Sequence, residues 1–578
     1  MRHFRIGRGL RAAVFASLIC LPVTSGDAQV ACVPGSTTVC VDQGGKWTNA
    51  TRKDFYSRDQ GSQMIPYPWI KALQTADGQP FLGDALARYG YLPDPFRKNM
   101  PVGFTIAGSG SKAIFGMTCA ACHTRVLSND GFNYLIDGGP AIVDFQGLLT
   151  DMIDAVARVR ADDAAFLTFG KAVLDKANPS KKELADLRTK VDIWYERENT
   201  LRERAYATPG IWGLGRLDAV SMIFNRLTGM DLGPAPTYLI AGNIQPANAP
   251  VRYPFLWNAA IQDTTQWPGF SPNGTAVTAL IRNSGEVYGV FGTLHPSAPS
   301  IWPGNVNYRD VNSANGDGLL KLERLIRQIG APKWPAQFPI STGLAKLGAP
   351  IYQAQCASCH GQTAGKPGFP NIPTWATPLQ DTGTDSLQYE ILARTADPGV
   401  LSNLRDPFDS SFRLANPSPS FTLLKYAILG SIVQKGTIVP AFLDDLGSSI
   451  GSKKGATVDE ARKRAFAAFA VKADPGTYKY ESRVMYGIWA AAPYLHNGSV
   501  ATLADLLTPD SQRPTTFKVG PNFDAKRVGL AADQPGSYAR TTTGCEARNS
   551  GNSHCGHNFG TDLSAADKAA LLEYMKTL

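Results

Sequence analysis

A helix is predicted immediately before Cys356. Leu344, Leu347, Ile351 and Tyr352 recur at intervals of three to four residues, which is the spacing that places side chains on one face of a helix. We expect this face to be buried. The pattern predicts an amphipathic helix that runs directly into Cys356.

A second helix is predicted at the C-terminus. Ser564-Ala-Ala-Asp567 resembles a capping box, which is typical of a helix start. An apolar stripe follows it, made of Leu571, Leu572, Met575 and Leu578. Such a stripe alone indicates ordinary core packing, but together with the helix before Cys356 it predicts two helices that cross each other.

The N-terminus has the three parts of an export signal. Arg2–Arg11 is basic, Ala12–Val23 is mostly apolar, and Gly26-Asp27-Ala28 fits a cleavage site, with Val23-Thr24-Ser25 as the alternative. A retained membrane anchor is the other interpretation, but a span needs about 20 apolar residues. We therefore expect residues 1–28 to be removed, leaving a periplasmic or secreted protein without a transmembrane segment.

Composition indicates a folded protein. The chain has 578 residues, of which 43% are hydrophobic and 18% are charged. Removal of residues 1–28 lowers the formal net charge from +9 to +6, and no long block of Lys or Arg remains. A nucleic-acid partner is therefore not expected.

Two C-x-x-C-H motifs determine the predicted chemistry. In this motif two thiols bond to the two vinyl groups of a haem, and the adjacent histidine supplies a nitrogen ligand to the iron. A C-x-x-C redox pair or half a zinc site would not explain a histidine directly after both pairs. The motifs predict two covalently bound haem c groups, attached at Cys119-Ala-Ala-Cys122-His123 and Cys356-Ala-Ser-Cys359-His360.

Four further cysteines remain after removal of the export signal, namely Cys32, Cys40, Cys545 and Cys555. Three pairings are possible. The local pairing, Cys32–Cys40 and Cys545–Cys555, closes short loops that lie far from the motif cysteines in the sequence. We predict this pairing because exported proteins commonly contain disulfides.

The sixth ligand decides what each haem does. Iron with two strong protein ligands transfers electrons, whereas iron with an open face can bind O2 or peroxide. Of the remaining histidines, His557 lies in a glycine-flanked loop before the terminal helix and is the preferred ligand of the second iron. His496 lies in a tight turn, His295 precedes a proline and is interpreted as structural, and His554 lacks adjacent glycines on both sides.

An aromatic-rich stretch contains Phe255, Trp257 and Trp267. It could form the wall of an apolar pocket at the first haem, and ordinary core packing is the alternative. Under the first interpretation, the candidate catalytic residues are His123 and Trp267.

The chain resembles the bacterial di-haem cytochrome c peroxidase superfamily, and within it the branch of exported di-haem rubber oxygenases (RoxA-like). The similar segments run from about residue 80 to the C-terminus. They are Cys119 to Thr124 with Ile136-Asp-Gly-Gly, Pro254-Phe-Leu-Trp257 with Gln266-Trp267, Arg282-Asn-Ser-Gly-Glu286, Gly487 to Ser499, and Gly556-His-Asn-Phe-Gly560.

This resemblance implies two unequal haems. It implies that His123 holds the first iron, whose other face takes O2, and that His360 and His557 both hold the second iron. The motif cysteines would attach the two haems.

The chain departs from the peroxidases at two positions. Peroxidases often place a Met ligand after the Pro-Tyr turn, but here the next Met after Tyr494 is Met575 in the terminal helix. Peroxidases also place a Trp between the haems soon after the first motif. Here the first Trp after His123 is Trp194, and Trp489 is a possible substitute.

The motifs and the resemblance together predict the fold class and the domain boundaries. We expect a mainly α fold with two cytochrome c-like haem domains, long loop-rich insertions and little β-structure. Residues 29–335 would form the N-terminal haem domain and residues 336–578 the C-terminal one. Charged residues within 151–205 predict solvated helices that cover the first domain.

Three functions agree with the sequence. The first is O2-dependent cleavage of an apolar unsaturated substrate, small or polymeric, at the first haem. The second is a peroxidase that uses hydrogen peroxide, and the third is an electron-transfer cytochrome without substrate chemistry. A redox partner protein is possible in each case.

Overall fold

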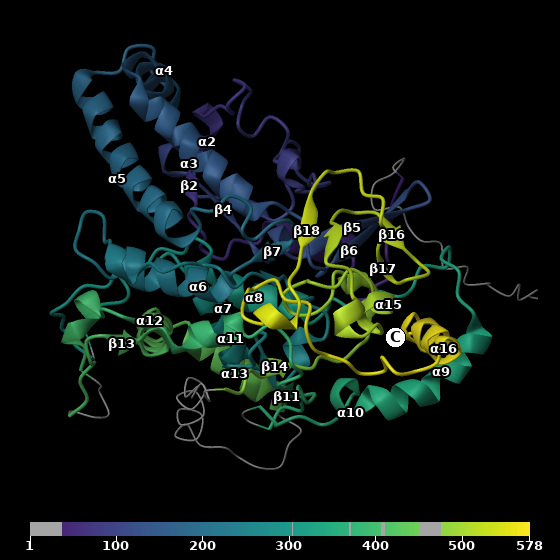
Figure 1. Ribbon diagram of the computed structural model, residues 1–578. Coiled ribbons are helices and arrows are strands. Elements are labelled where there is room, and N and C mark those ends of the chain that lie inside the picture. The colour runs from purple at the N-terminus through teal and green to yellow at the C-terminus, as the bar shows by residue number, and fades with distance from the viewer. Residues whose placement is uncertain (1–36, 303, 369–370, 406–410, 450–475) are drawn as a thin grey trace, which may run out of the picture.

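The computed structural model describes residues 37–302, 304–368, 371–405, 411–449 and 476–578 (Figure 1). The predicted export signal, residues 1–28, and Cys32 lie outside the described residues. Cleavage after Ala28 therefore stays a prediction.

Two three-stranded sheets surround the first C-x-x-C-H motif. One has the order β1–β6–β5, with β1 (Thr38–Cys40) parallel to β6 (Phe132–Asp137) and β5 (Thr124–Asn129) antiparallel to it. The other has the order β2–β4–β3, all antiparallel, with β2 (Ile65–Pro66), β4 (Ile114–Met117) and β3 (Phe104–Ala107). The motif connects β4 to β5.

The N-terminal half contains eight described helices. They are α1 (Asn49–Ser57), α2 (Tyr67–Ala72), α3 (Phe145–Ala161), α4 (Asp163–Leu174), α5 (Lys181–Ala205), α6 (Ala219–Phe224), α7 (Ala276–Gly289) and α8 (Gly316–Ile326). Of these, α1 and α2 pack against the β2–β4–β3 sheet. Helices α3, α4 and α5 form the upper left of Figure 1 and confirm the helices predicted within residues 151–205. Side chains of Asp144, Asp162 and Ser180 cap their N-termini.

The C-terminal half contains seven described helices. They are α9 (Thr342–Gln355), α10 (Ala357–His360), α11 (Leu387–Glu390), α12 (Ser420–Gln434), α13 (Ile438–Ser449), α15 (Leu503–Leu506) and α16 (Ala565–Met575). No single helix among the described residues is long and apolar enough to cross a membrane. Together, helices α12 and α13 have the length and apolar composition of a membrane span, but they are bent by 83° at the break between them.

Six antiparallel strand pairs complete the described fold. They are β7 (Arg216–Leu217) with β8 (Val251–Arg252), β9 (Thr264–Thr265) with β10 (Ser271–Pro272), β11 (Leu379–Gln380) with β14 (Tyr480–Glu481), β12 (Thr395–Ala396) with β13 (Ser418–Pro419), β15 (Thr516–Lys518) with β18 (Ala539–Thr541), and β16 (Phe523–Asp524) with β17 (Gly529–Leu530).

The expectation of a mainly α fold with little β-structure needs correction, because helices and many small sheets occur together. Most of these strands have two or three residues, which is too short for an alternating apolar pattern to be recognised. Their pairing also joins distant segments, as in β11 with β14. Neither feature can be read from local sequence.

The predicted crossing of two helices is confirmed by α9 and α16, which pack closely against each other. The predicted buried face of α9 is partly wrong. Leu344 is 37% exposed and Leu347 is 64% exposed, whereas Ala345, Gly348 and Tyr352 are buried. The reason is that α16 approaches along the small residues of α9, where the two backbones can come close.

Gly348 is the point of closest approach, and its replacement should destabilise the protein. A Cβ atom at this position would lie 2.0 Å from the carbonyl oxygen of Ala570. Because a backbone atom cannot move away as a side chain can, we expect Gly348→Ala to lower the free energy of unfolding by about 1–3 kcal/mol.

Gly343→Ala is the matched control, since Gly343 lies in the same helix and a Cβ atom added there would have nothing within 4 Å. Alanine favours helix over glycine by up to about 1 kcal/mol, so this variant should be unchanged or stabilised. Denaturant unfolding of both variants measures the difference. Equal stability of the two would contradict a tight crossing at Gly348.

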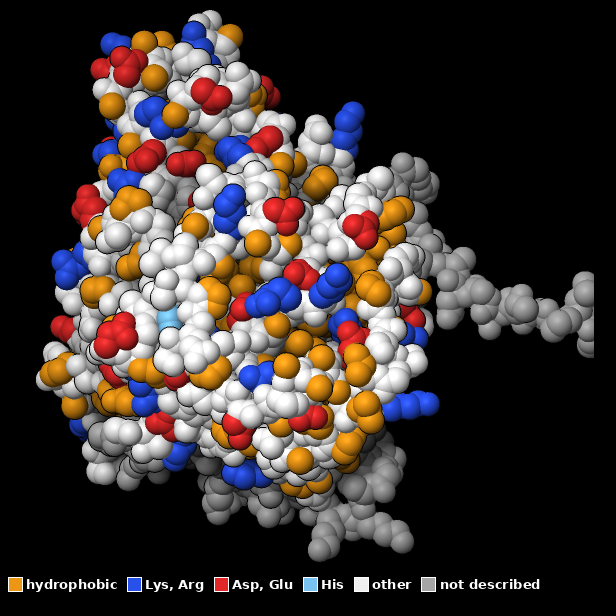
Figure 2. All heavy atoms as spheres, turned by 45° about the vertical axis from the view of Figure 1, so that its right-hand side comes forward, with side chains coloured by type: hydrophobic (Ala, Val, Ile, Leu, Met, Phe, Trp, Pro, Cys, Tyr) orange, Lys and Arg blue, Asp and Glu red, His pale blue; other side chains and the backbone are white. Residues whose placement is uncertain are grey.

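One hydrophobic core joins segments from both halves of the chain. It includes Val41, Leu127 and Phe255 together with Trp489 and Leu571. The domain boundary at residue 335 stays a prediction. On the face drawn in Figure 2, side chains of Lys and Arg are interspersed with those of Asp and Glu, and hydrophobic side chains gather in its lower part.

Candidate haem-binding sites

The first motif forms a tight turn between two strands. Cys119–Ala121 is a single 3-10 turn, and the backbone N–H of His123 donates to the carbonyl of Cys119 at 3.0 Å. Strand β4, rather than the helix typical of a cytochrome c domain, leads into this motif. The turn places both thiols and the imidazole close together.

His123 is fixed by the segment that follows β6. The backbone N–H of Gly138 donates to the carbonyl of His123 at 2.8 Å. Beside it, the fully buried carboxylate of Asp137 accepts from Arg52 Nε at 2.7 Å and from the hydroxyl of Tyr56 at 2.5 Å. Trp47 Nε1 also donates to it at 2.7 Å. The Ile136-Asp-Gly-Gly segment is thus a support for the first motif.

The first motif retains the groups that haem attachment needs. Cys119 and Cys122 are free thiols, and desolvation raises the pKa of each to about 12. Desolvation lowers the pKa of His123 to about 4, and the polar backbone of Pro254 opposes this shift, although His123 Nδ1 has no hydrogen-bond partner among the described residues. The imidazole is therefore neutral at pH 7, which is the form that binds iron.

The second motif follows the helix pair. Cys356 ends α9, and the next turn is α10 with His360 as its last residue. The Nδ1 atom of His360 donates to the carbonyl of Arg483 at 2.7 Å. A metal-binding histidine typically uses its second nitrogen in this way, which fixes the ring and leaves Nε2 for the metal.

His557 faces His360 across a large cavity. The cavity has an empty volume of about 1290 Å³, including open solvent at its mouth, and both imidazoles line it with Cys356 and Cys359. The two ring centres are 6.2 Å apart. Two imidazoles that bind one transition-metal ion through nitrogens at about 2.0–2.1 Å have ring centres about 6 Å apart.

The residues at the second motif therefore fit a haem c. The two thiols are free rather than joined as a disulfide, they line the same cavity as both imidazoles, and the spacing of His360 and His557 suits one ion between them. Burial lowers the pKa of His557 to about 3 and also lowers that of His360, so both are neutral at pH 7.

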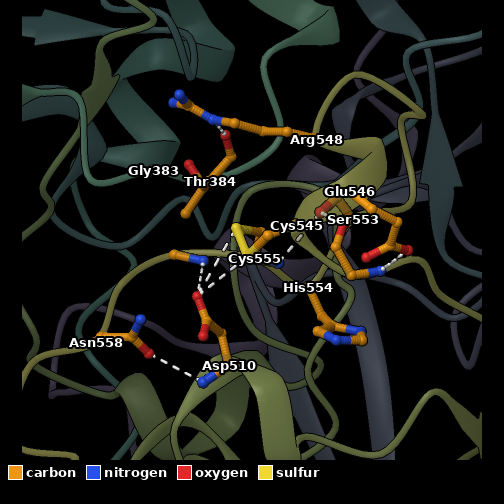
Figure 3. Close-up of a disulfide and its surroundings, with 12 residues drawn as sticks. Gly383, Thr384, Asp510, Cys545, Glu546, Arg548, Ser553, His554, Cys555 and Asn558 are labelled. Atoms are coloured by element: carbon orange, nitrogen blue, oxygen red, sulfur yellow. Dashed lines mark hydrogen bonds between the residues drawn. A yellow bond between two sulfur atoms is a disulfide. The ribbon is translucent and has the colours of Figure 1, made fainter.

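A disulfide lies beside the loop that carries His557 (Figure 3). Cys545 and Cys555 are bonded, as predicted. The carboxylate of Asp510 accepts from the backbone N–H of Gly556 at 2.9 Å. Gly556 has φ +78, and a Cβ atom there would lie 2.3 Å from the backbone of Gly383, so glycine is required for this approach.

Arg513 secures the same loop from the other side. Its buried guanidinium donates to the carbonyls of His554 at 2.6 Å, Gly556 at 2.7 Å and His557 at 3.2 Å. The backbone N–H of His557 donates to Thr382 at 2.8 Å. The loop is thus a rigid support for an imidazole.

The remaining predicted disulfide is only half described. Cys40 is disulfide-bonded, and Cys32 lies outside the described residues. The pairing of these two cysteines stays a prediction.

The other histidines have separate roles. His554 Nδ1 hydrogen-bonds Thr542 at 2.8 Å, and the His295 ring stacks on Tyr238 with centres 3.6 Å apart, which agrees with a structural interpretation. His496 lines the cavity that His360 and His557 share, hereafter the larger cavity. Its ring stacks on that of Tyr480, with ring centres 3.9 Å apart. Sequence reasoning did not place His496 there.

Trp267 is the tryptophan that lines the larger cavity. Its Nε1 donates to the carbonyl of Arg252 at 3.2 Å. The other two candidate tryptophans lie elsewhere: Trp489 is fully buried and bonds to Pro332, and Trp194 bonds to Met64 from within α5. Phe255 also lines this cavity, whereas Trp257 is a fully buried core residue.

A second cavity has an empty volume of about 580 Å³. No residue of the first motif lines it, but the charges of its lining residues Arg282 and Glu286 act on Cys119. Its wall is mostly apolar, with Phe224, Phe270 and Phe421 in it, and Glu286 is at its polar end. The charge of Glu286 contributes to the raised pKa of Cys119, which places this carboxyl near the first motif.

The sequence does not mark Glu286 by itself as a functional side chain. The signal that could have indicated a functional role is that Glu286 belongs to Arg282–Glu286, one of the segments similar to the di-haem peroxidase superfamily. Gln266 donates to its carboxylate at 2.7 Å. Burial raises the pKa of Glu286 while the charge of Arg282 opposes that shift, so the carboxyl can carry a proton at higher pH than an exposed one.

The two motifs have unequal surroundings. Among the residues that the structure describes, no histidine ring stands opposite His123 as His557 stands opposite His360, and the ring next to His123 is that of Tyr253 at 6.1 Å. Met485 and Met575 line the larger cavity as well. The sequence pointed to Met575 but not to Met485, which precedes the Pro-Tyr turn.

Two protein families match parts of the chain. The family described as RoxA-like, cytochrome c-like matches residues 479–518. The family described as cytochrome C oxidase, cbb3-type, subunit III matches residues 343–399, which include the second motif. These matches support a protein of the cytochrome c family that binds haem c.

Two proteins of Sinorhizobium fredii (strain NBRC 101917 / NGR234) are similar to the chain. Uncharacterized protein y4iJ is 27% identical over 600 residues, with 92% of each chain covered. Uncharacterized protein y4iM is 39% identical over 94 residues, which cover 14% of this chain and 21% of that protein. Their names assign no activity.

Proposed function

We propose that this haem cytochrome is an exported di-haem oxidoreductase that cleaves an apolar unsaturated substrate with O2 at the first motif. Cys119, Cys122 and His123 would hold the first haem, and Cys356, Cys359, His360 and His557 would hold the second. When bound, a haem with one protein ligand supplies O2 or peroxide chemistry, and a haem with two supplies electron transfer.

The unequal surroundings of the two motifs carry this proposal. His360 has an imidazole 6.2 Å away on the opposite side of the cavity, whereas His123 has no such counterpart among the described residues. One site is thus suited to electron transfer and the other to an exchangeable ligand. An electron carrier would not need this difference.

The second cavity, whose residue Glu286 acts electrostatically on Cys119, supports an apolar substrate. Its aromatic wall is continuous, since the rings of Phe270 and Phe421 are 4.9 Å apart and those of Phe224 and Phe421 are 5.1 Å apart. Such a wall excludes water and favours a hydrocarbon chain. The sequence predicts Trp267 in a pocket at the first haem, but it lines the cavity of His360 and His557, and its neighbour Gln266 lines this one. A position of Trp267 beside the second haem is therefore proposed.

Isotope labelling tests the proposed reaction. The purified haem-loaded protein is incubated with a long-chain apolar alkene under ¹⁸O2. Cleavage of one C=C bond by one O2 should give two carbonyl products, each with one labelled oxygen atom. Products that form without O2, or none with any alkene offered, would contradict this function.

Glu286 favours hydrogen peroxide as a second candidate oxidant. Cleavage of the O–O bond of peroxide needs a group that moves a proton, and a buried carboxyl with a raised pKa can do so. Glu286 is hydrogen-bonded to Gln266, and both residues line the second cavity.

Replacement of Glu286 by glutamine separates the two oxidants. Gln keeps the shape and the hydrogen bonding but cannot transfer a proton, so peroxide turnover should fall by about 10²–10⁴-fold if Glu286 is the acid–base group. Turnover with an electron donor measures this. Asp445→Asn is a matched control, because burial also raises the pKa of Asp445, to about 6, but this residue does not line the cavity. Unchanged peroxide turnover in Glu286→Gln would exclude the proposed role.

A further inference from the structure

Two buried arginines line the larger cavity, which contains the second motif. Arg252 is 4% exposed and Arg483 is 6% exposed, and both line that cavity. Arg483 contacts His360 of the second motif, and its charge acts on His123 of the first. Its carbonyl accepts from His360 Nδ1 at 2.7 Å, and its guanidinium lies 4.0 Å from the ring centre of Phe255, the neighbour of Pro254 at the first motif.

Both guanidinium groups have buried N–H donors without a protein acceptor among the described residues. Arg252 uses Nε to reach Leu495 at 3.0 Å, and its Nη1 has no partner. Arg483 uses Nη2 to reach Gln262 at 3.0 Å, and its Nε and Nη1 have none. A buried donor left unpaired costs about 1–3 kcal/mol, more when charged, so an acceptor outside the chain is indicated.

The charge of the two arginines is only partly balanced. Glu481 lies 3.6 Å from Arg483 Nε, which is beyond hydrogen-bond distance. Arg282 does not need this carboxylate, because it pairs with Glu323 at 2.7 Å. Two guanidinium groups therefore line the cavity with one carboxylate, that of Glu481. One positive charge is left unbalanced, and a further anion could balance it.

We infer that Arg252 and Arg483 form a carboxylate-binding subsite that holds the propionate groups of a haem attached at one of the two motifs. The planar fork of a guanidinium matches a carboxylate in shape and charge. The inference rests on the proposed function, because it requires haem at these motifs. The subsite would also fix the haem relative to Trp267, over which the Arg252 guanidinium lies at 4.8 Å.

The test is the pH dependence of the haem midpoint potentials. An arginine partner keeps a propionate ionised, so the potential should be constant between about pH 5 and pH 8. Loss of the arginine should make the haem potential more negative at the upper end of this pH range. The potential should then rise as pH falls, because the unpaired carboxylate takes up a proton.

The design removes the other titratable group that pairs with Arg483. Arg483→Gln and Arg252→Gln are each made in a Glu481→Gln background, so that titration of Glu481 cannot produce the effect. His496, Tyr480 and Arg282 also face or border this cavity and stay unchanged in every variant. Arg540→Gln is the matched control, since Arg540 is 1% exposed but does not line the cavity.

The arms of the experiment identify the anion. A shift in the CO-binding haem assigns the propionates of the first motif, and a shift in the other haem assigns those of the second. A potential of the Glu481→Gln protein that changes with added inorganic phosphate would instead indicate a small solution anion and overturn the inference.

Stability of the variants is checked by haem content. If the glutamine variants do not fold with two haems, Arg483→Lys and Arg252→Lys are used, because lysine keeps the charge without the fork. The haem potentials of the lysine variants should depend on pH less than those expected for the glutamine variants. Potentials that stay constant with pH in all folded variants overturn the inference, while a wild type without two unequal haems would instead overturn the proposed function.

Discussion

His557→Ala is expected to change the second haem from a low-spin to a high-spin or water-bound form while the first haem keeps its response to ligands. The reason is that His557 supplies the imidazole opposite His360, 6.2 Å away, and alanine has no atom that can bind iron. Absorption and electron paramagnetic resonance spectra of the oxidised protein measure the change.

His554→Ala is the matched control for this variant. His554 lies three residues earlier in the same loop, and its ring hydrogen-bonds Thr542 rather than lining the larger cavity. Its removal should leave both haem spectra unchanged. A low-spin spectrum that persists in His557→Ala would assign the ligand to another residue at the cavity, with Met485 and Met575 as the next candidates.

Replacement of Cys119 and Cys122 by serine together should remove one covalent haem and all O2-dependent activity. Serine cannot form the thioether bonds that fix haem to the chain. The intact mass should then contain one haem instead of two, and the spectrum of the six-coordinate haem should remain. Mass spectrometry and the ¹⁸O2 assay measure both effects.

The reciprocal variant has serine at Cys356 and Cys359. It should also lose one haem, but the remaining haem should be the one that binds exogenous ligands. If either double variant kept two covalent haems, or if wild type carried one, the assignment of one haem to each motif would be wrong.

Local sequence was sufficient for several parts of the site. The motif spacing itself encodes the positions of His123 and His360, and the glycines beside His557 indicated a backbone that can approach a flat cofactor. The crossing of α9 and α16 followed from two apolar stripes. These features depend on neighbours within a few residues, which sequence reasoning treats well.

Long-range packing set the rest. The face that α9 buries is chosen by the approach of α16 along Gly348, not by the larger apolar residues Leu344 and Leu347. Most of the described strands have two or three residues and are too short to predict. Arg483, whose carbonyl contacts His360 of the second motif, follows β14, which pairs with β11, and no pattern within either strand indicates that pairing.

The same limit applies to the aromatic residues. Trp194, Trp267 and Trp489 are equivalent by type, and their order along the chain does not distinguish which of them lies near a haem. Only the folded arrangement shows that Trp267 lines the cavity shared with His360. The charge of Glu286 near Cys119 likewise becomes visible only in the folded chain.

The central claim is that two haems of one chain differ in coordination, and the number of CO molecules bound by the fully reduced wild-type protein tests it most directly. One CO for every two haems is expected, with the spectrum of the His360–His557 site unchanged. Binding of two CO molecules would show that both irons have an open face. Binding of none would contradict an exchangeable face at the first motif and leave an electron carrier.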